Sequence, residues 1–268
     1  MNESSEGFSF QFHLDTIRFL TISSFWSFSY EHSYIAFHDA RPAGVVIDTV
    51  DKDEREAFTF YWGVNQPFRK TTLGFKLLMT YLDQVAREGF HRNHGNISPD
   101  SPRTLYERIG CEVKRETLQM ESAEAYNDND QYTRDPRIEE IRLEDFLADR
   151  DGVKNEPATW SLRPNSIRTA SRWLRFVKYN DICAAYYPHS TGSVVIDLKG
   201  HDLNKEHVST LLGQIARSSN NKRCTLSYVP SASPLAAILT ELGYKAANRA
   251  TSIVLDLQRW QTRRQPSE

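Results

Sequence analysis

The pattern of apolar and polar positions in the first half of the chain predicts the strands of a mixed α/β unit. Two β-prone runs within residues 33–50 are separated by a turn signal, for which Asp39, Pro42 and Gly44 supply the turn-forming residues. A further run over residues 57–64, AFTFYWGV, is rich in aromatic and β-branched side chains and predicts a third strand.

Helical periodicity follows this third run. Leucine, tyrosine and valine side chains recur at helical spacing from Thr72 to Glu88, and the glycine that comes next is a stop signal. A shorter helix is predicted over residues 102–109, closed by Gly110, and residues 111–120 alternate as a strand should.

The second half repeats this order of elements. The pattern predicts in turn a strand, a helix, a strand, a short helix that ends at a glycine, and a last strand, over residues 193–200, 204–219, 224–230, 233–244 and 251–257. No clear residue-level repeat accompanies this order, so the repetition rests on the elements. Two tandem copies of one fold is the simplest interpretation.

An acidic segment separates the two halves. Glu121–Ala158 carries twelve acidic and five basic residues and has few candidates for a core, so we expect a connector made of loop and exposed helix. Ile138, Ile141 and Leu147 are predicted to form a weak apolar stripe on a helix. The expected domains are residues 1–120 and 159–268, with residues 121–158 as an acidic linker.

Composition narrows the classes of function. The chain has 268 residues, 39% hydrophobic and 25% charged, as in ordinary globular proteins. A net charge of −2 gives no reason to expect nucleic acid or a membrane as partner, and no apolar stretch is long enough to span a membrane. The acidic N-terminus does not fit a signal peptide. Three widely spaced cysteines suit neither a disulfide framework nor a zinc site, which favours a reducing, cytoplasmic setting.

The strongest chemical signal lies between Gly63 and Leu78, where a strand passes through a basic loop into a helix. The start of a helix presents backbone N–H groups without partners and the positive end of the helix dipole, which suits a pyrophosphate. Arg69 and Lys70 contribute positive charge, and Thr71 and Thr72 contribute hydroxyl donors. Gly74 allows a ligand or backbone to approach closely.

This segment resembles the signature of the GNAT acetyltransferase superfamily, in which a strand ending in V-x-P-x-(Y/F)-R precedes x-x-G-x-G and a leucine-rich helix. The chain reads VNQPFRKTTLG over residues 64–74. It matches the family at Val64, Phe68, Arg69, Leu73, Gly74, Leu77 and Leu78. It departs at Gln66, where proline is usual, and at Thr72, where the first glycine of the motif is usual. We expect the Thr72 side chain to alter the affinity for coenzyme A.

A second motif supports the same resemblance. GNAT proteins often carry N-x-x-A-x-x-L-Y-x-x-x-G-F further along the chain, and residues 105–111 read LYERIGC. The asparagine of the family falls at Pro99, so it is missing in register. The spacing from Arg69 to Tyr106 is normal for the family, and the two motifs at this spacing are more specific than either motif alone.

The resemblance implies a fold and a reaction. The fold is α/β, with two GNAT-like units, each a mixed, twisted β-sheet flanked by α-helices. The backbone of Trp62, Gly63 and Val64 is expected to pair with the pantetheine arm of acetyl-CoA or another acyl-CoA. The loop from Arg69 to Gly74 would hold the pyrophosphate. A neutral amine then attacks the thioester, and Tyr106 protonates the departing thiolate.

The general base and the acceptor stay open. No carboxylate lies in the strand Phe58–Val64, so the base is a water, a residue from the N-terminal part, or none if the amine arrives neutral. The expected acceptor is a primary amine of a small molecule or amino acid. Two alternatives remain: a non-catalytic protein of this fold that binds acyl-CoA or a partner, and an aminoacyl or long-chain acyl transferase. The oligomeric state is open.

The resemblance weakens in the second half, where residues 160–257 match only as an order of elements. The loop after the strand SVVIDL reads KGHDLN, without Arg-x-x-Gly-x-Gly, and Asp202 would oppose a phosphate. We therefore expect a degenerate second copy and one molecule of coenzyme A per chain.

Histidine and aromatic residues of the first half are interpreted as structural. His91 and His94 are three apart, but a polar turn is the favoured interpretation and no metal is expected. His32 and His38 are expected at the surface or at strand edges rather than in an acceptor pocket. The aromatic residues between Phe19 and Tyr30 are expected in the core.

Overall fold

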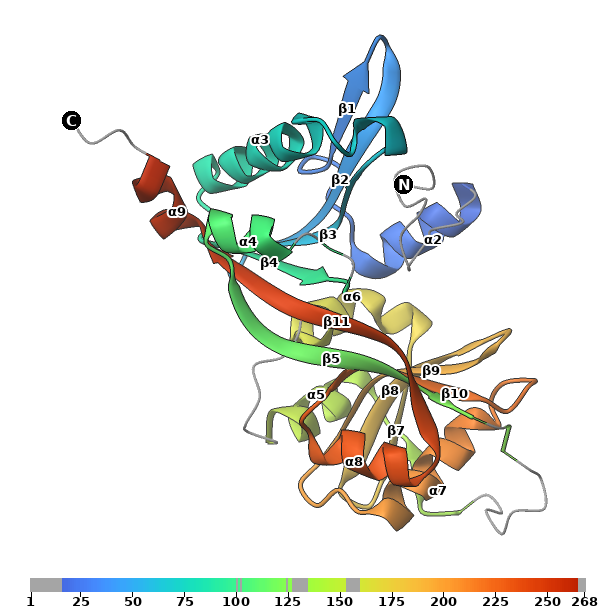
Figure 1. Cartoon of the computed structure of the whole chain (residues 1–268). Helices are drawn as coiled ribbons and strands as arrows, with labels where there is room; N and C mark the ends of the chain where they lie inside the picture. Colours follow the sequence, from blue (N-terminus) through green and yellow to red (C-terminus); the bar gives the residue numbers. More distant parts are fainter. Residues whose placement is uncertain are drawn as a thin grey trace. The chain divides into compact units, whose positions relative to one another are not determined.

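A computed structural model of the protein divides the chain into two compact units (Figure 1). Unit 1 comprises Met1–Lys114 and Thr251–Glu268, and unit 2 comprises Arg115–Ala250. The residues that the structure describes are 16–99, 101, 103–123, 125–126, 135–152 and 160–264. No helix among them is long and apolar enough to cross a membrane.

Unit 1 is a mixed sheet flanked by helices. Its elements are α2 (Thr16–Trp26), β1 (Tyr34–His38), β2 (Arg41–Asp51), β3 (Glu56–Val64), η1 (Gln66–Phe68), α3 (Leu73–Arg87), β4 (Arg92–Ile97), α4 (Arg103–Ile109), the end of β11 (Tyr244–Asp256) and α9 (Leu257–Arg264). The strands follow the order β1-β2-β3-β4-β11, and β3 runs parallel to β4 while the other neighbours are antiparallel. Leu78, Tyr81 and Leu82 of α3 pack into the core of this unit.

The C-terminal strand contributes to unit 1 rather than to unit 2 alone. Thr251 to Asp256 pair antiparallel with Ile97 to Arg92 of β4, and Leu255, Leu257 and Trp260 lie in the same apolar core as α3. The expected division into residues 1–120 and 159–268 therefore differs from the compact units. That expectation assumed that each copy is built from a continuous stretch of chain, whereas unit 1 is built from both ends.

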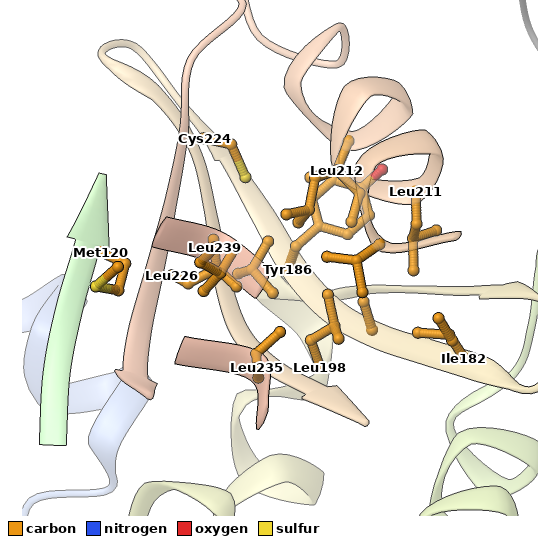
Figure 2. Close-up of a cluster of buried hydrophobic side chains, with 14 of the residues drawn as sticks. Met120, Ile182, Tyr186, Leu198, Leu211, Leu212, Cys224, Leu226, Leu235 and Leu239 are labelled. Carbon is orange, nitrogen blue, oxygen red and sulfur yellow. The ribbon is translucent and has the colours of Figure 1, made fainter. Parts of the chain in front are cut away.

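Unit 2 contains the remaining strands of the 11-stranded mixed sheet. Its elements are most of β5 (Glu112–Ser122), β6 (Ile138–Glu140), α5 (Leu143–Gly152), η2 (Trp160–Leu162), α6 (Pro164–Ala170), η3 (Ser171–Trp173), β7 (Arg175–Tyr179), β8 (Ile182–His189), β9 (Gly192–Gly200), α7 (Lys205–Ala216), β10 (Cys224–Pro230), α8 (Pro234–Glu241) and the start of β11. The strand order is β5-β10-β9-β8-β7-β6, with only the β9–β10 pair parallel among these described strands. Figure 2 shows its core, where Leu211 and Leu212 on a helix face Tyr186 of the sheet.

The acidic segment is part of unit 2 where the structure describes it. Ile138 to Glu140 form β6 and pair with β7, and Phe146 and Leu147 of α5 are buried, at 0% and 4% exposure. Residues 124, 127–134 and 153–158 of the expected linker lie outside the described residues. The strongly acidic composition concealed these few apolar positions, because they recur too rarely to produce a clear period.

Most local predictions are confirmed, and two need correction. The strands at β1, β2 and β3 and the helices α3 and α4 form where the pattern predicts them. The β1–β2 turn, however, consists of Asp39 and Ala40, with φ of 48° and 62°, and Pro42 and Gly44 are strand residues of β2. Gly44 is needed there because a Cβ would lie 2.8 Å from Cγ1 of Val64.

The second correction concerns the histidine-rich segment near His91 and His94. The predicted polar turn is wrong, since Arg92–Ile97 forms β4. Its polar side chains are satisfied inside the unit: His94 Nε2 lies 2.9 Å from Oε2 of Glu56 on β3. A central strand is difficult to predict from sequence when its side chains are polar and are satisfied by polar partners on other elements.

Candidate functional site

The end of β3 leaves its parallel neighbour. The register with β4 covers Glu56 to Thr59 opposite Arg92 to Gly95 and ends there. The register with β2 continues to Val64 opposite Gly44. Between them Thr59 pairs with Asp48 and Tyr61 with Ile47, so Phe60 is the extra residue of a β-bulge. Bulges bend a strand and re-aim its side chains, which here separates the end of β3 from the β3–β4 ladder.

A compact basic loop connects β3 to α3. The 3₁₀ turn Gln66–Phe68 begins after Asn65, whose N–H donates to the carbonyl of Ala43 over 2.9 Å. Arg69 is half-buried, and its Nε donates to the carbonyl of Val64 over 3.5 Å. Lys70 is exposed. The loop therefore brings two cations to the start of α3.

The first turn of α3 contains backbone N–H groups that have no hydrogen-bond acceptor among the described residues. Thr72 makes no side-chain cap, and in the part of the chain that the structure describes the N–H groups of Gly74 and Phe75 donate to no protein acceptor. The Thr71 hydroxyl is already engaged: it donates to the carbonyl of Phe68 (2.8 Å) and accepts from the N–H of Leu73 (3.2 Å). Free N–H groups at a helix start, with adjoining cations, form an anion-binding arrangement.

Gly74 faces the sheet. A Cβ at this position would lie 3.4 Å from Cζ2 of Trp62 and 3.4 Å from Cγ1 of Val64. The Trp62 indole also donates from Nε1 to the carbonyl of Gly74 over 3.0 Å. The glycine therefore lets the first turn of α3 pack closely on the end of β3, and its backbone N–H is the group left for a ligand.

Tyr106 on α4 lies against this strand end. Its ring centroid is 6.1 Å from that of Trp62, and the two rings meet edge to face at 88°. Its hydroxyl makes no hydrogen bond with any residue of the described ranges. Burial, and then the neighbouring Cys111, raise the pKa of Tyr106 above its ordinary value, so it holds its proton at neutral pH. Burial also raises the pKa of the Cys111 thiol to about 12.

The structure brings the predicted residues together in unit 1. Trp62 to Val64 form the end of β3, Arg69 to Thr72 form the loop, Leu73 and Gly74 begin α3, and Tyr106 contacts Trp62. The start of the short helix at Pro102 lies outside the described residues.

One buried carboxyl near this site was missed from the sequence. Asp48 of β2 is fully buried opposite Thr59, and its Oδ1 accepts a hydrogen bond from the Tyr81 hydroxyl over 2.7 Å. Oδ2 has no hydrogen-bond partner among the described residues. Burial raises the pKa of Asp48 well above its ordinary value, although the Tyr81 hydrogen bond opposes this. An aspartate inside the apolar run VVIDTV was the signal that could have found it.

The carboxyl of β3, Glu56, is not placed to act as a base. Glu56 lies at the first residue of the strand, at the opposite end from Val64. It is held there by His94 and by Arg92, whose Nη1 lies 3.2 Å from Oε1. The base that the sequence left open is therefore not identified among the carboxyls of β3.

The histidines among the described residues of unit 1 have structural partners. His32 is buried and lies between Ser29 Oγ and Glu88 Oε2, each 2.6 Å from a ring nitrogen, which differs from the expected surface position. His38 is exposed, as expected, beside the ring of Phe68. No group of three or more His, Cys, Asp or Glu side chains suited to a metal occurs among the described residues.

The expected aromatic core is shown in part. Phe28 is buried and its ring lies 4.6 Å from that of Phe60, while Tyr30 is 61% exposed. Phe19 and Trp26 pack on the same pair of rings.

Comparisons with known proteins identify the fold. No family model and no curated protein matches the chain. A GCN5-related N-acetyltransferase from Sphaerobacter thermophilus superposes with a TM-score of 0.68 at 12% identity, over 96% of this chain and 90% of that one. A GCN5-related N-acetyltransferase from Kribbella flavida gives 0.59 at 13% identity, over 94% and 67%. A tandem GNAT protein from the clavulanic acid biosynthesis pathway gives 0.55 at 10% identity, over 86% and 85%.

The chain therefore has the GNAT fold, in a tandem arrangement. This confirms the predicted α/β class with two mixed, helix-flanked units. At identities this low the likeness shows the fold alone, so the reaction has to be argued from the site.

Proposed function

We propose that unit 1 is an N-acyltransferase that moves an acetyl or other short acyl group from coenzyme A to a primary amine of a small molecule or amino acid. The observation that carries the proposal is the path of β3. After Thr59 it leaves β4 and leads through a basic loop into the start of α3, which has no side-chain cap.

Each part of this path suits one part of an acyl-CoA. The backbone at Trp62, Gly63 and Val64 lies beyond the register with β4, where an extended pantetheine arm can pair with it as an added strand does. The N–H groups of Gly74 and Phe75 suit the pyrophosphate, with Arg69 and Lys70 supplying charge. Of the two threonines, Thr72 has the hydroxyl that is free to donate.

Tyr106 is the proposed general acid. A neutral amine attacks the thioester carbonyl, the C–S bond breaks, and the thiolate takes the phenolic proton. Its raised pKa keeps that proton in place before the reaction. A water restores the proton afterwards, using the one that the amine releases. None of the three cysteines forms a disulfide among the described residues. A cytoplasmic setting remains part of this proposal.

Binding and turnover test the proposal separately. Acetyl-CoA should raise the melting temperature, since a ligand at a hundred times its dissociation constant stabilises the native state by about 2.7 kcal/mol. A screen of amine acceptors that measures free thiol then tests turnover. No binding by calorimetry at millimolar acetyl-CoA would contradict the proposal.

The two alternatives predict other results in the same experiments. Binding without turnover on any acceptor supports a non-catalytic acyl-CoA-binding protein. Preference for long-chain acyl-CoAs over acetyl-CoA supports a long-chain acyl transferase, and turnover with aminoacyl donors supports an aminoacyl transferase.

A further inference from the structure

The side chain of Trp62 contacts both ends of the candidate site. On one side its Nε1–H donates to the carbonyl of Gly74, 3.0 Å away in the first turn of α3. On the other side its ring meets the ring of Tyr106 edge to face. One indole thus joins the helix start proposed to bind phosphates to the side chain proposed to donate the proton.

The bond to Gly74 holds the helix start in a defined orientation. A backbone carbonyl has two acceptor lone pairs, so the Gly74 carbonyl can take the indole N–H in addition to its bond within the helix. Its own residue and Phe75 carry the N–H groups that have no protein acceptor. The hydrogen bond from Trp62 to the Gly74 carbonyl therefore restrains the same turn whose N–H groups would face the ligand.

The contact with Tyr106 orients the acid. Edge-to-face aromatic pairs have a preferred geometry and contribute about 0.5–1.5 kcal/mol beyond the area they bury. Since the Tyr106 hydroxyl has no hydrogen bond to any described residue, packing of its ring is what sets its direction. Trp62 supplies that packing from the strand end.

We propose that Trp62 is a positioning residue, which through its indole N–H orients the phosphate-binding turn of α3 and through its ring orients Tyr106. This inference rests on the proposed function, because it concerns the same site. It differs from a role in core packing alone, and from a role in which Trp62 contributes only backbone to the pantetheine arm. Each of these simpler roles predicts a different response to removing the indole nitrogen.

The main test is Trp62→Phe, which keeps a ring beside Tyr106 and removes the donor to Gly74. Two ligands are titrated by calorimetry: acetyl-CoA, and adenosine 3′-phosphate 5′-diphosphate, which is the nucleotide half of coenzyme A without pantetheine. We expect both dissociation constants to rise by a similar factor of about three to ten, the size expected for the loss of one hydrogen bond. Trp173→Phe, at a half-exposed tryptophan of unit 2, is the matched control and should change neither constant.

A second variant separates the two contacts. Trp62→Leu loses the ring as well as the donor, so Tyr106 loses its edge-to-face partner. With saturating thioester, kcat of this variant should fall about tenfold below that of Trp62→Phe, because a misplaced acid is a poorer proton donor. The nucleotide affinities of the two variants should be alike. This split between binding and kcat would not arise from a general loss of packing, which would change both.

Three results would overturn the inference. They are unchanged affinity of Trp62→Phe for both ligands, weakening for acetyl-CoA but not for the nucleotide, and equal kcat in the two variants. A wild-type protein that binds neither ligand would instead contradict the proposed function. Should a variant fold poorly, the wild type gives the answer by NMR: the indole N–H resonance of Trp62 should shift when the nucleotide binds, and an unchanged resonance overturns the proposal.

Discussion

Units 1 and 2 each contain a strand that leaves its parallel neighbour and carries a bulge at the next residue. In unit 1 the bulged residue of β3 is Phe60, just after the register with β4 ends at Thr59. In unit 2 the bulged residue of β9 is Ile196, just after the register with β10 ends at Val195. The strand geometry is therefore common to both units and cannot by itself give one of them a ligand.

The helix that follows the strand is where the two units differ. At the start of α7, Oδ1 of Asn204 accepts the N–H of His207 over 2.9 Å, so a side chain already occupies the position of a ligand. Glu206 adds negative charge in the first turn, and Asp202 precedes it. At the start of α3, Thr72 makes no cap and the preceding charges are positive. Under the proposed function, helix capping and loop charge, more than the strand, are what distinguish the anion-binding unit from the other.

The largest effect is expected from removing the strand that unit 1 takes from the C-terminal end. A chain ending at Ala250 lacks Leu255, Leu257 and Trp260, which are 2%, 0% and 5% exposed. Each such side chain stabilises the fold by about 1.5–3 kcal/mol, and a whole domain has a margin of about 5–15 kcal/mol. We expect unit 1 to unfold and to lose acetyl-CoA binding, as measured by limited proteolysis and calorimetry.

The control for this truncation is a chain ending at Arg264, which keeps α9 and should behave as the full chain does. If the chain ending at Ala250 melts and binds acetyl-CoA like this control, the C-terminal strand is not part of the functional unit.

This C-terminal strand also marks the limit of the sequence analysis of the fold. Residues 251–257 were recognised as a strand because their alternation is a local property. Their pairing with β4 was not foreseen, because nothing local in a strand identifies its neighbour. The strand β4 itself was missed for a related reason: Asn93 and His94 are polar, and the side chains that satisfy them, Tyr81 and Glu56, come from other elements.

The elements around the basic loop were predicted better than β4 because they are continuous in sequence. The end of β3, the basic loop and the start of α3 follow one another, and one periodicity change locates them. What the sequence did not reveal is which way each group points. Gly74 is buried under Trp62, and the Thr71 hydroxyl is used inside the loop, and both facts depend on packing between elements.

The next largest effect is expected at Tyr106. Tyr106→Phe keeps the ring against Trp62, so the fold and the affinity for acetyl-CoA should change little. Loss of a general acid costs about 10²–10⁴-fold in rate, and since a thiolate is a fair leaving group we expect kcat to fall about a hundredfold. Steady-state kinetics with the acceptor found in the screen measure this. Tyr30→Phe, at an exposed tyrosine, is the control; full turnover in Tyr106→Phe would place the acid elsewhere.

A charge reversal at each helix start tests the difference between the units directly. Lys70→Glu places an anion beside the N–H groups of α3 and should weaken acetyl-CoA binding by about tenfold or more. Lys205→Glu does the same at α7, where Lys205 is exposed, and should leave binding unchanged. Calorimetry on the wild type should give one molecule per chain. Two equivalent sites, or equal losses in the two variants, would show that unit 2 also binds the cofactor.

Gly74→Glu is a poorer test of this difference than Lys70→Glu, because the new side chain would also displace Trp62.

The buried carboxyl of unit 1 should make stability depend on pH. The pKa of Asp48 is raised in the folded state, so its favourable contribution is complete below its unfolded pKa of about 3.9 and is lost as the pH rises through the folded value. Asn at this position does not titrate. We expect the Tm of Asp48→Asn, relative to wild type, to increase as the pH rises from 4 until it passes the folded pKa of Asp48. Tyr81 and Tyr34 titrate well above this range, since their pKa values are raised above 10. Parallel pH profiles for the two proteins would mean that Asp48 is ionised in the folded protein.

The smallest effects are expected from the two cap positions, and each variant should change a different quantity, stability in one and affinity in the other. Asn204→Ala removes a side chain that accepts an N–H of α7, so it should lower the free energy of unfolding by about 1 kcal/mol and leave acetyl-CoA affinity unchanged. Thr72→Ala removes a hydroxyl that makes no hydrogen bond within the described residues, so the free energy of unfolding should change by less than about 0.5 kcal/mol. If that hydroxyl donates to the pyrophosphate, the dissociation constant of acetyl-CoA should rise about three- to tenfold. Denaturant melts and calorimetry on both variants measure all four quantities. A stability loss in Thr72→Ala as large as that in Asn204→Ala would show that Thr72 caps α3, and the difference between the two helix starts would then lie in their charges alone.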